Sequence, residues 1–355
     1  MRYIVIGAGA VGGSIGASLF AAGSEVVLVA RGEHRDRIAE AGLEFATPRG
    51  TENLRVPVVA GPDELDLEPD DVLIVAVKVQ DSLATLDEWS GRPVTGGGTA
   101  GTELPVVCAQ NGVEGERIAL RRFARVYGMC VVLPAGYLTP GRITAIGDPE
   151  VGALTIGRYP TGSDGLVHRI SADLRQANIA GYPSTTVMRW KYAKLLANLG
   201  NAVEAICGPV EGEAAVALLR RARSEGEHAL KVAGIDYADP AENGGVHLRL
   251  RTGEIAGQPR AGGSTWQSLT RGAGSVEADY LAGEIVLIGR LGGIPTPVNE
   301  TLNRIADEMS RRGLAPGSRT AEELLVLVDE AAVRAEARTD EVTLLPAQQA
   351  SSVSR

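Results

Sequence analysis

Short, continuously apolar runs separated by a glycine-rich segment open the chain. Residues 3–6 (YIVI) form one run, residues 13–22 have the composition of a helix, and residues 25–30 (EVVLVA) form a second run. A strand, a helix and a strand within about 30 residues make a βαβ unit. Parallel strands covered by helices on both faces are apolar throughout, so this pattern predicts the start of a parallel sheet.

Later apolar runs predict that this sheet continues. Residues 72–77 (VLIVAV) and 104–109 (LPVVCA) are expected to be buried strands, and residues 56–59 a short one. Residues 91–101 are rich in Gly and Thr and predict a surface loop. Residues 125–158 contain strand-like pieces separated by turn signals, and we expect antiparallel strands that extend the sheet.

The pattern becomes mainly helical toward the C-terminus. A helix is expected at about 164–177, and a longer one from Ser184 or Thr185 to about residue 206, where Gly208 and Pro209 end it. Further helices are expected at 211–234, 264–291 and 297–312.

The change of pattern near Pro183 predicts two domains. Residues 1–183 are expected to form an α/β Rossmann domain and residues 184–325 an all-α domain. Residues 334–355, which end in QQASSVSR, are expected to be a disordered tail. Small ligands often bind between two domains, so we expect the site in the cleft between them.

Composition narrows the class of protein. The 355 residues carry a formal net charge of −9, which gives no general support for binding nucleic acid or a membrane surface. No uninterrupted apolar stretch reaches about 18 residues, so no transmembrane helix is expected. The three cysteines, Cys108, Cys130 and Cys207, are widely spaced. We expect them to be reduced, in a cytoplasmic protein with no metal site.

The glycine-rich turn is the candidate cofactor site. It has the pattern G-x-G-x-x-G between two predicted strands, and its candidate cofactor-binding residues are Gly7, Ala8, Gly9, Ala10, Val11 and Gly12. In such turns the glycines allow a tight turn, close approach of a pyrophosphate and close helix packing, while the helix N-terminus faces the phosphates. The alternative is an ordinary glycine-rich turn between a strand and a helix.

The end of the second predicted strand distinguishes NADP from NAD. Enzymes that use NAD usually have a carboxylate there, which binds the ribose 2′-hydroxyl. Here Arg31 follows the strand, and its guanidinium can pair with a 2′-phosphate. NADPH is therefore the expected cofactor. Two alternatives stay open: Arg31 is a solvated surface charge, or Glu33 reaches a 2′-hydroxyl.

Residues 188–201 (MRWKYAKLLANLGN) carry a polar stripe on a mostly apolar segment. On a helix, Lys191, Lys194, Asn198 and Asn201 are spaced 3, 4 and 3 and share one face. Reduction of a keto group by hydride transfer needs a proton donor and polar groups that fix the substrate, which such a stripe can supply. A solvated helix face is the alternative.

Together these segments resemble the ketopantoate reductase family over about residues 1–310. The resemblance rests on GAGAVGG with Arg31, a strand ending in Lys78, Asn111-Gly112, Trp190 with Lys194-x-x-x-Asn198, Ser264-Thr265-Trp266-Gln267, and Glu277-x-Asp279-x-x-x-Gly283. It implies a Rossmann domain followed by an all-α domain like the C-terminal domain of 6-phosphogluconate dehydrogenase. It also implies NADPH-dependent reduction of 2-dehydropantoate, a small 2-keto acid.

The resemblance further implies roles for single residues. Lys194 would be the general acid that protonates the keto oxygen, and Glu277 would bind the substrate hydroxyl and orient that lysine. Lys78 and Asn111 would position the cofactor and the carbonyl group. The remaining implied residues would bind the substrate, the last two at its carboxylate: Asn198, Asn201, Ser264 and Thr265.

Three departures from the family pattern fall in the substrate site. Tyr192 stands where the family has a lysine two residues after its tryptophan, so Lys191 competes with Lys194 as the proton donor. Asn201 follows Asn198 by three residues instead of four, and Thr265 takes the place of the substrate-binding serine. The cofactor site is not affected, so the departures bear on which keto acid is reduced.

Other functions therefore stay open. The chain could reduce another 2-keto acid or oxidise a 2-hydroxy acid. A dehydrogenase of 3-hydroxy acids would normally show a different glycine-rich motif after the cofactor domain. A non-catalytic regulator that binds NADP(H) would not need Lys194 or Glu277. The helical domain is compatible with a homodimer.

Overall fold

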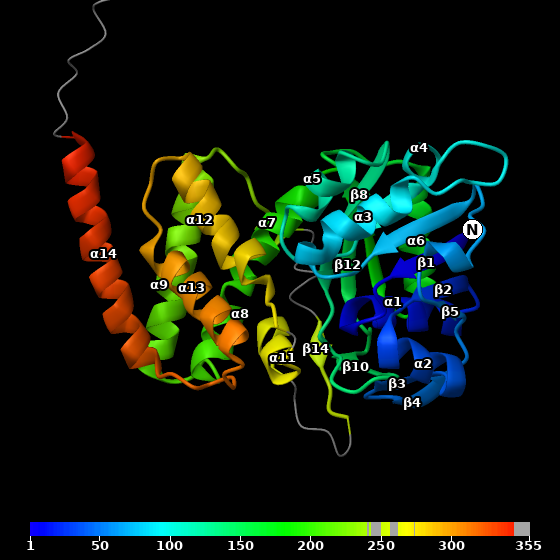
Figure 1. Ribbon diagram of the computed structural model, residues 1–355, viewed down its shortest axis with the longest axis horizontal. Helices are drawn as coiled ribbons and strands as arrows, with labels where there is room; N and C mark the ends of the chain where they lie inside the picture. The colour runs from blue at the N-terminus through cyan, green and yellow to red at the C-terminus, as the bar shows by residue number, and fades with distance from the viewer. Residues whose placement is uncertain (240, 243–249, 256–261, 273, 344–355) are drawn as a thin grey trace, which may run out of the picture.

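The computed structural model describes residues 1–239, 241–242, 250–255, 262–272 and 274–343. One part of it is built on a sheet and the other on helices, and the two lie side by side (Figure 1). The sheet part ends with a strand at Pro183, and the first helix of the helical part begins at Val187. The class of fold expected from the sequence, a Rossmann-like sheet followed by helices, is confirmed.

Eight strands form the main sheet. In sheet order they are β13 (Ala180–Pro183), β12 (Ala153–Arg158), β8 (Arg125–Val132), β7 (Pro105–Cys108), β6 (Asp71–Val75), β1 (Arg2–Ile6), β2 (Glu25–Val29) and β5 (Val58–Val59). Every neighbouring pair is parallel except β8 with β12. The strand order reverses at β1, whose neighbours are β2 and β6, and in such sheets ligands bind beyond the carboxyl ends of the strands at this position.

Helices cover both faces of this sheet. Alternate residues of β1 point to opposite faces: Tyr3 and Val5 pack with α1 (Ala10–Ala21) and α6 (Gly165–Gln176), whereas Ile4 and Ile6 pack with α3 (Ser82–Ser90) and α5 (Gly115–Leu120). This double burial explains why the strands are apolar without alternation.

A second sheet corrects the expectation for residues 125–158. Its order is β4 (Gly50–Leu54), β3 (Leu43–Thr47), β10 (Arg142–Ala145) and β9 (Ala135–Gly136). Only β12 extends the main sheet antiparallel, while β8 is parallel to β7. The expectation was wrong for β9 and β10, because β10 pairs with β3 of a hairpin at 43–54 that the apolar pattern did not reveal, and β9 pairs with β10.

The helical part contains α7 (Val187–Asn198), α8 (Gly200–Cys207), α9 (Gly212–Val232), α11 (Ser264–Thr270), α12 (Ala282–Leu291), α13 (Pro297–Arg312) and α14 (Ala321–Thr343). Three expected helices are confirmed as α6, α9 and α13. Two expected long helices were wrong in extent. One is divided into α7 and α8 near Gly200, and the other into α11, the 3-10 turn η4 (Glu277–Tyr280) and α12.

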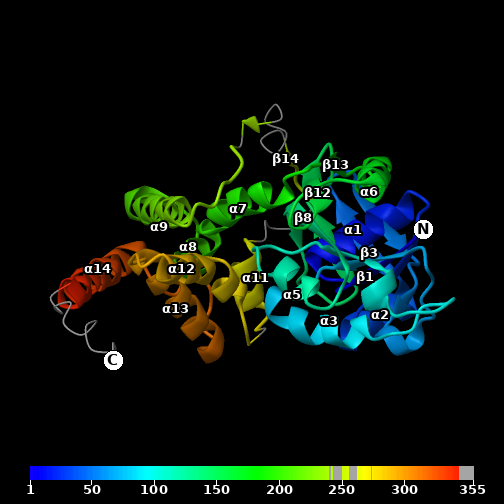
Figure 2. The same ribbon diagram turned by 90° about the horizontal axis from the view of Figure 1, so that it is seen from above.

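The C-terminal region also differs from the expectation. Residues 334–343 were expected in a disordered tail, but they continue α14, which packs on α9 and α13 (Figure 2). Its sequence, AAVRAEARTDEV, is rich in Ala, Glu and Arg, which favour helices. Residues 344–355 lie outside the described residues. The loop expected at 91–101 is a tight turn that leads into α4 (Ala100–Glu103).

Short strands also connect the two parts. The segment after α9 returns to the sheet part, where β14 (Arg251–Thr252) pairs antiparallel with β11 (Gly147–Asp148). Gly253 N donates to Ile146 O at 2.8 Å and extends this pairing. Among the described helices, none combines the length and the apolar character that a membrane span requires.

Candidate active site

The glycine-rich turn joins β1 to α1 and leaves its helix N-terminus open. Gly7 has φ +101°, and the N–H groups of Gly7 and Ala8 both donate to Val29 O at 3.1 Å. Gly9 is the N-cap of α1, without a side-chain cap. The first N–H groups of this helix are therefore free to bind an anion.

The glycines of this turn have different surroundings. A Cβ added to Gly12 would overlap Gly7 O and lie 2.8 Å from Ala76 Cβ, so a larger residue would push α1 away from the sheet. A Cβ added to Gly9 would meet nothing within 4 Å, so this side of the turn is open. The residues present thus fit the pyrophosphate of a dinucleotide, with close packing behind it and space in front.

Arg31 lies beyond the end of β2 and begins α2 (Gly32–Ala41). Its Nη2 is 2.7 Å from Oε2 of Glu88 on α3, and its side chain is 70% exposed. Glu33 lies in the first turn of α2 and is 3.7 Å from Arg37. Arg31 is thus an exposed cation beyond the end of β2, paired with a carboxylate.

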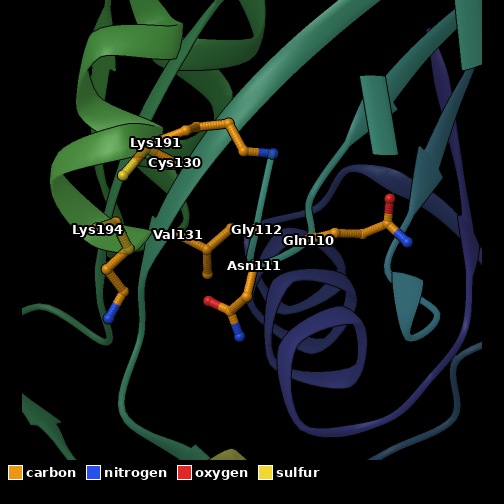
Figure 3. A pocket seen from close by; sticks show the side chains of 7 residues that line it. All are labelled: Gln110, Asn111, Gly112, Cys130, Val131, Lys191 and Lys194. Atoms are coloured by element: carbon orange, nitrogen blue, oxygen red, sulfur yellow. The ribbon is translucent and has the colours of Figure 1, made fainter. Parts of the chain in front are cut away.

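The two lysines of α7 lie in different environments. Lys191 is 2% exposed and forms an ion pair with the fully buried Glu116 of α5. Lys194 lies one turn further along, and both lysines line a pocket with Asn111 and Cys130. In Figure 3 the side chains of Lys194 and Asn111 extend toward the same side of the pocket, whereas that of Lys191 extends away from them.

The charge on each lysine is balanced differently. Among the described residues, Lys194 has no hydrogen bond and no ion pair. Burial lowers the pKa of Lys194, and the neighbouring Cys130 opposes this effect only in part. Burial also raises the pKa of Glu116, against the attraction of Lys191.

The asparagines expected at the site form two separate pairs. Asn198 Nδ2 donates to Asn111 Oδ1 at 3.2 Å, which joins α7 to the turn after β7. Gly112, at φ +73°, lets this turn pass under η4, because an added Cβ would lie 2.7 Å from Tyr280 O. Asn201 Nδ2 donates to Ser264 Oγ at 3.4 Å, at the start of α11. Thr265 is 2% exposed, one residue further on.

Glu277 and Lys78 meet across the two parts of the chain. Lys78 Nζ lies 2.6 Å from Glu277 Oε2, and the Val79 N–H donates to Glu277 Oε1 at 3.2 Å. The expected orienting contact between Glu277 and Lys194 is not among the described interactions. Glu277 therefore binds the carboxyl end of β6, beside the site, and not the lysine of α7.

Some residues of the site carried no signal in the sequence. Glu116 looks like an ordinary charge on a short helix, yet it neutralises Lys191. His34 lies in a charged segment, RGEHRD, yet its Nε2 donates to Ala8 O of the glycine-rich turn at 2.7 Å. Both partners are distant in sequence, so spacing alone could not reveal them. The described residues contain no group of three or more His, Cys, Asp or Glu that could hold a metal ion.

A Rossmann-type sheet with an open helix N-terminus, together with a half-buried lysine that has no charged partner among the described residues, is typical of a dinucleotide-dependent oxidoreductase. The chain matches the family described as ketopantoate reductase PanE/ApbA over residues 3–161, and the C-terminal region of the same family over residues 178–310. The chain belongs to this family. The family uses a nicotinamide cofactor, which is NADPH.

Individual relatives agree with this assignment. A 2-dehydropantoate 2-reductase of Pyrococcus abyssi is 26% identical over 306 residues, which cover 84% of this chain and 94% of the relative. The crystal structure of a PanE/ApbA family ketopantoate reductase from Ralstonia eutropha is 26% identical, with a TM-score of 0.71, and covers 88% of this chain and 99% of that one. D-mandelate dehydrogenase, solved with NADH and anilino(oxo)acetate, has the same fold, with 20% identity, a TM-score of 0.73, and coverage of 88% and 99%.

Proposed function

We propose that this chain reduces the keto group of 2-dehydropantoate with NADPH and that Lys194 is the general acid. The observation that carries the proposal is the position of Lys194, half-buried and without a charged partner among the described residues, beside Asn111 at the carboxyl end of β7. The nicotinamide, when bound, supplies the hydride.

Lys194 has the properties that protonation of a keto oxygen requires. As hydride reaches the carbonyl carbon, negative charge develops on the oxygen, and an ammonium within hydrogen-bonding reach stabilises and protonates it. Burial lowers the pKa of Lys194, which makes transfer of its proton easier. Lys191 is a poorer candidate because its ammonium is already held by Glu116.

The neighbouring polar groups would fix the substrate around this proton donor. The amides of Asn111 and Asn198 already contact each other at 3.2 Å, and both can turn toward a bound carbonyl or hydroxyl group. Glu277, held by Lys78 and by the Val79 N–H, would accept a hydrogen bond from a substrate hydroxyl.

The substrate carboxylate would bind at the start of α11. Asn201 and Ser264 are paired there at 3.4 Å, a long contact that a carboxylate can replace with two shorter ones. Thr265 adjoins them. Arg31 would exchange Glu88 for the 2′-phosphate, which favours NADPH over NADH.

The first test follows NADPH oxidation by absorbance with 2-dehydropantoate and a panel of other 2-keto acids. We expect turnover of 2-dehydropantoate, and for Lys194→Ala a decrease of kcat by about 10²–10⁴-fold with unchanged NADPH affinity. The matched control is Lys231→Ala, which removes an exposed lysine from α9 and should leave kcat unchanged. Turnover that survives the loss of Lys194 would refute its role.

A second candidate function has the same chemistry with another 2-keto acid, or the reverse oxidation of a 2-hydroxy acid. It is favoured by Tyr192 and by the shifted position of Asn201, both of which affect the substrate side only. In the same assay, preference for a different keto acid would select it. Tight NADPH binding without turnover of any keto acid would instead favour a non-catalytic role.

Two further points of organisation belong to the proposal. Residues 1–183 would form the cofactor domain and residues 184–325 the substrate domain. A homodimer is compatible with the exposed helical surface, and light scattering of the purified protein would measure the oligomeric state.

A further inference from the structure

Arg271, directly after α11, lies against the sheet part of the chain. Its Nη1 donates to Tyr137 O at 2.6 Å, and its guanidinium carbon is 5.0 Å from the centroid of the Tyr137 ring. Within the described part of the chain, no Asp or Glu lies within 4.0 Å of this guanidinium. Burial lowers the pKa of Arg271, and Tyr137 opposes this only in part. A half-buried guanidinium without a carboxylate is suited to bind an anion from solution.

Tyr137 connects Arg271 to the glycine-rich turn. Its ring lies 4.5 Å from the ring of His34, tilted by 46°. His34 Nδ1 accepts from the Gly141 N–H at 2.9 Å, so the ring proton is on Nε2, which donates to Ala8 O at 2.7 Å. Two side chains in contact, His34 and Tyr137, therefore connect the glycine-rich turn to the guanidinium.

Helix α11, which Arg271 follows, also binds the backbone around Tyr137. Gln267 Oε1 accepts from the Tyr137 N–H at 3.3 Å, and Gln267 Nε2 donates to Ala135 O at 3.0 Å. Helix α11 is thus fixed to residues 135–137, which keeps Arg271 against Tyr137.

We propose that Arg271 binds the pyrophosphate of the dinucleotide from the side opposite α1, so that both parts of the chain hold the cofactor. The proposal rests on the NADPH-dependent function proposed above. The N–H groups at the start of α1 would bind one side of the pyrophosphate, and the planar guanidinium would bind the other through paired hydrogen bonds.

The substrate carboxylate is a less suitable partner for Arg271. The polar pair proposed to bind that group, Asn201 with Ser264, is at the start of α11, and Arg271 is seven residues further along. At 1.5 Å per residue the two positions are about 10 Å apart along the chain direction of α11, so they belong to opposite ends of this helix.

The test measures NADPH affinity by fluorescence titration of the purified protein and, separately, the KM for the keto acid at saturating NADPH. For Arg271→Gln we expect the Kd for NADPH to rise by about tenfold or more, which corresponds to about 1.4 kcal/mol per factor of ten, with an unchanged KM for the keto acid. The difference from the unmodified protein should shrink at high ionic strength. Arg290→Gln, which removes an exposed arginine from α12, is the matched control and should bind NADPH as before.

Arg271→Lys tests how much of the NADPH affinity depends on the positive charge and how much on the planar guanidinium. It should lose less affinity than Arg271→Gln, because the cation remains. Equal losses in both variants would overturn the proposal in favour of the hydrogen bond to Tyr137 O. An unchanged NADPH affinity, or an effect on the keto acid KM alone, would also overturn it. If the unmodified protein fails to bind NADPH, the proposed function fails instead, which is a separate outcome.

Discussion

Two lysines three residues apart on one helix have acquired opposite environments. Lys191 is buried against Glu116, a pair that joins α7 to α5, whereas Lys194 faces the pocket without a charged partner among the described residues. The sequence could place both on one polar stripe, but it could not distinguish them. The difference comes from Glu116, which is 75 residues away in sequence and lies under the helix only in the folded chain.

Removing one member of the buried pair should destabilise the fold without affecting the chemistry. Glu116→Gln leaves the Lys191 ammonium buried and unbalanced, and we expect the free energy of unfolding to fall by about 3–5 kcal/mol. Urea unfolding followed by circular dichroism measures it, with the exposed Glu103→Gln as control. Adding Lys191→Met should restore most of the loss and leave kcat intact. An equally stable Glu116→Gln protein would contradict this account.

At the scale of the elements, the glycines of the turn have distinct tasks. Gly12→Ala would overlap Gly7 O, so we expect a loss of stability that thermal unfolding detects, of about 1–3 kcal/mol as for other overpacked sites. A Cβ at Gly9 would meet nothing within 4 Å, and Gly9 has φ −73°, so the Gly9→Ala protein should fold normally. It should bind NADPH more weakly, because the added Cβ would occupy the space of the pyrophosphate. Equal effects of both substitutions on stability would contradict this division.

Local patterns predicted the parallel strands and most helices, because burial on both faces and helix periodicity leave a direct trace in the sequence. They did not predict which strands pair. The strands β9 and β10 belong to a small sheet with a hairpin at 43–54, whose β4 is largely exposed and shows no apolar alternation. For the same reason the contact of Lys78 with Glu277, 199 residues apart, was not predicted: the resemblance to a family gave each residue a separate role.

At the scale of the whole molecule, one buried carboxyl group lies where the two parts meet. Glu284 of α12 is 6% exposed, and its ionisable neighbours are Glu114 at the N-cap of α5, Arg117 of α5, Tyr192 of α7 and Tyr280 of η4. Burial, with a smaller effect of Glu114, raises the pKa of Glu284 from 4.5 to about 7. Ionisation of this group therefore opposes the packing of the two parts.

Because Glu284 binds its proton more tightly in the folded chain, the free energy of unfolding should depend on pH. Between pH 4.5 and about pH 7 the Glu284 carboxyl keeps its proton in the folded chain but loses it in the unfolded chain. The stability that the neutral carboxyl contributes is therefore fully present below pH 4.5 and is lost as the pH rises to about 7. We expect Glu284→Gln to be more stable than the unmodified protein at pH 8, by up to about 3 kcal/mol, and nearly equal at pH 4.5. Unfolding at both pH values measures this, with exposed Glu40→Gln as control. A difference independent of pH would contradict it.

The return of β14 to β11 determines how the two parts can move. The backbone passes from the sheet part to the helical part between Pro183 and Val187, and it touches the sheet part again where Arg251 pairs with Asp148. The two parts are also joined by the side-chain contacts of Lys191 with Glu116 and of Lys78 with Glu277. Any motion of one part against the other must therefore either keep the pairing of β14 with β11 or break it, and a distance label on each of these two strands would tell the two cases apart.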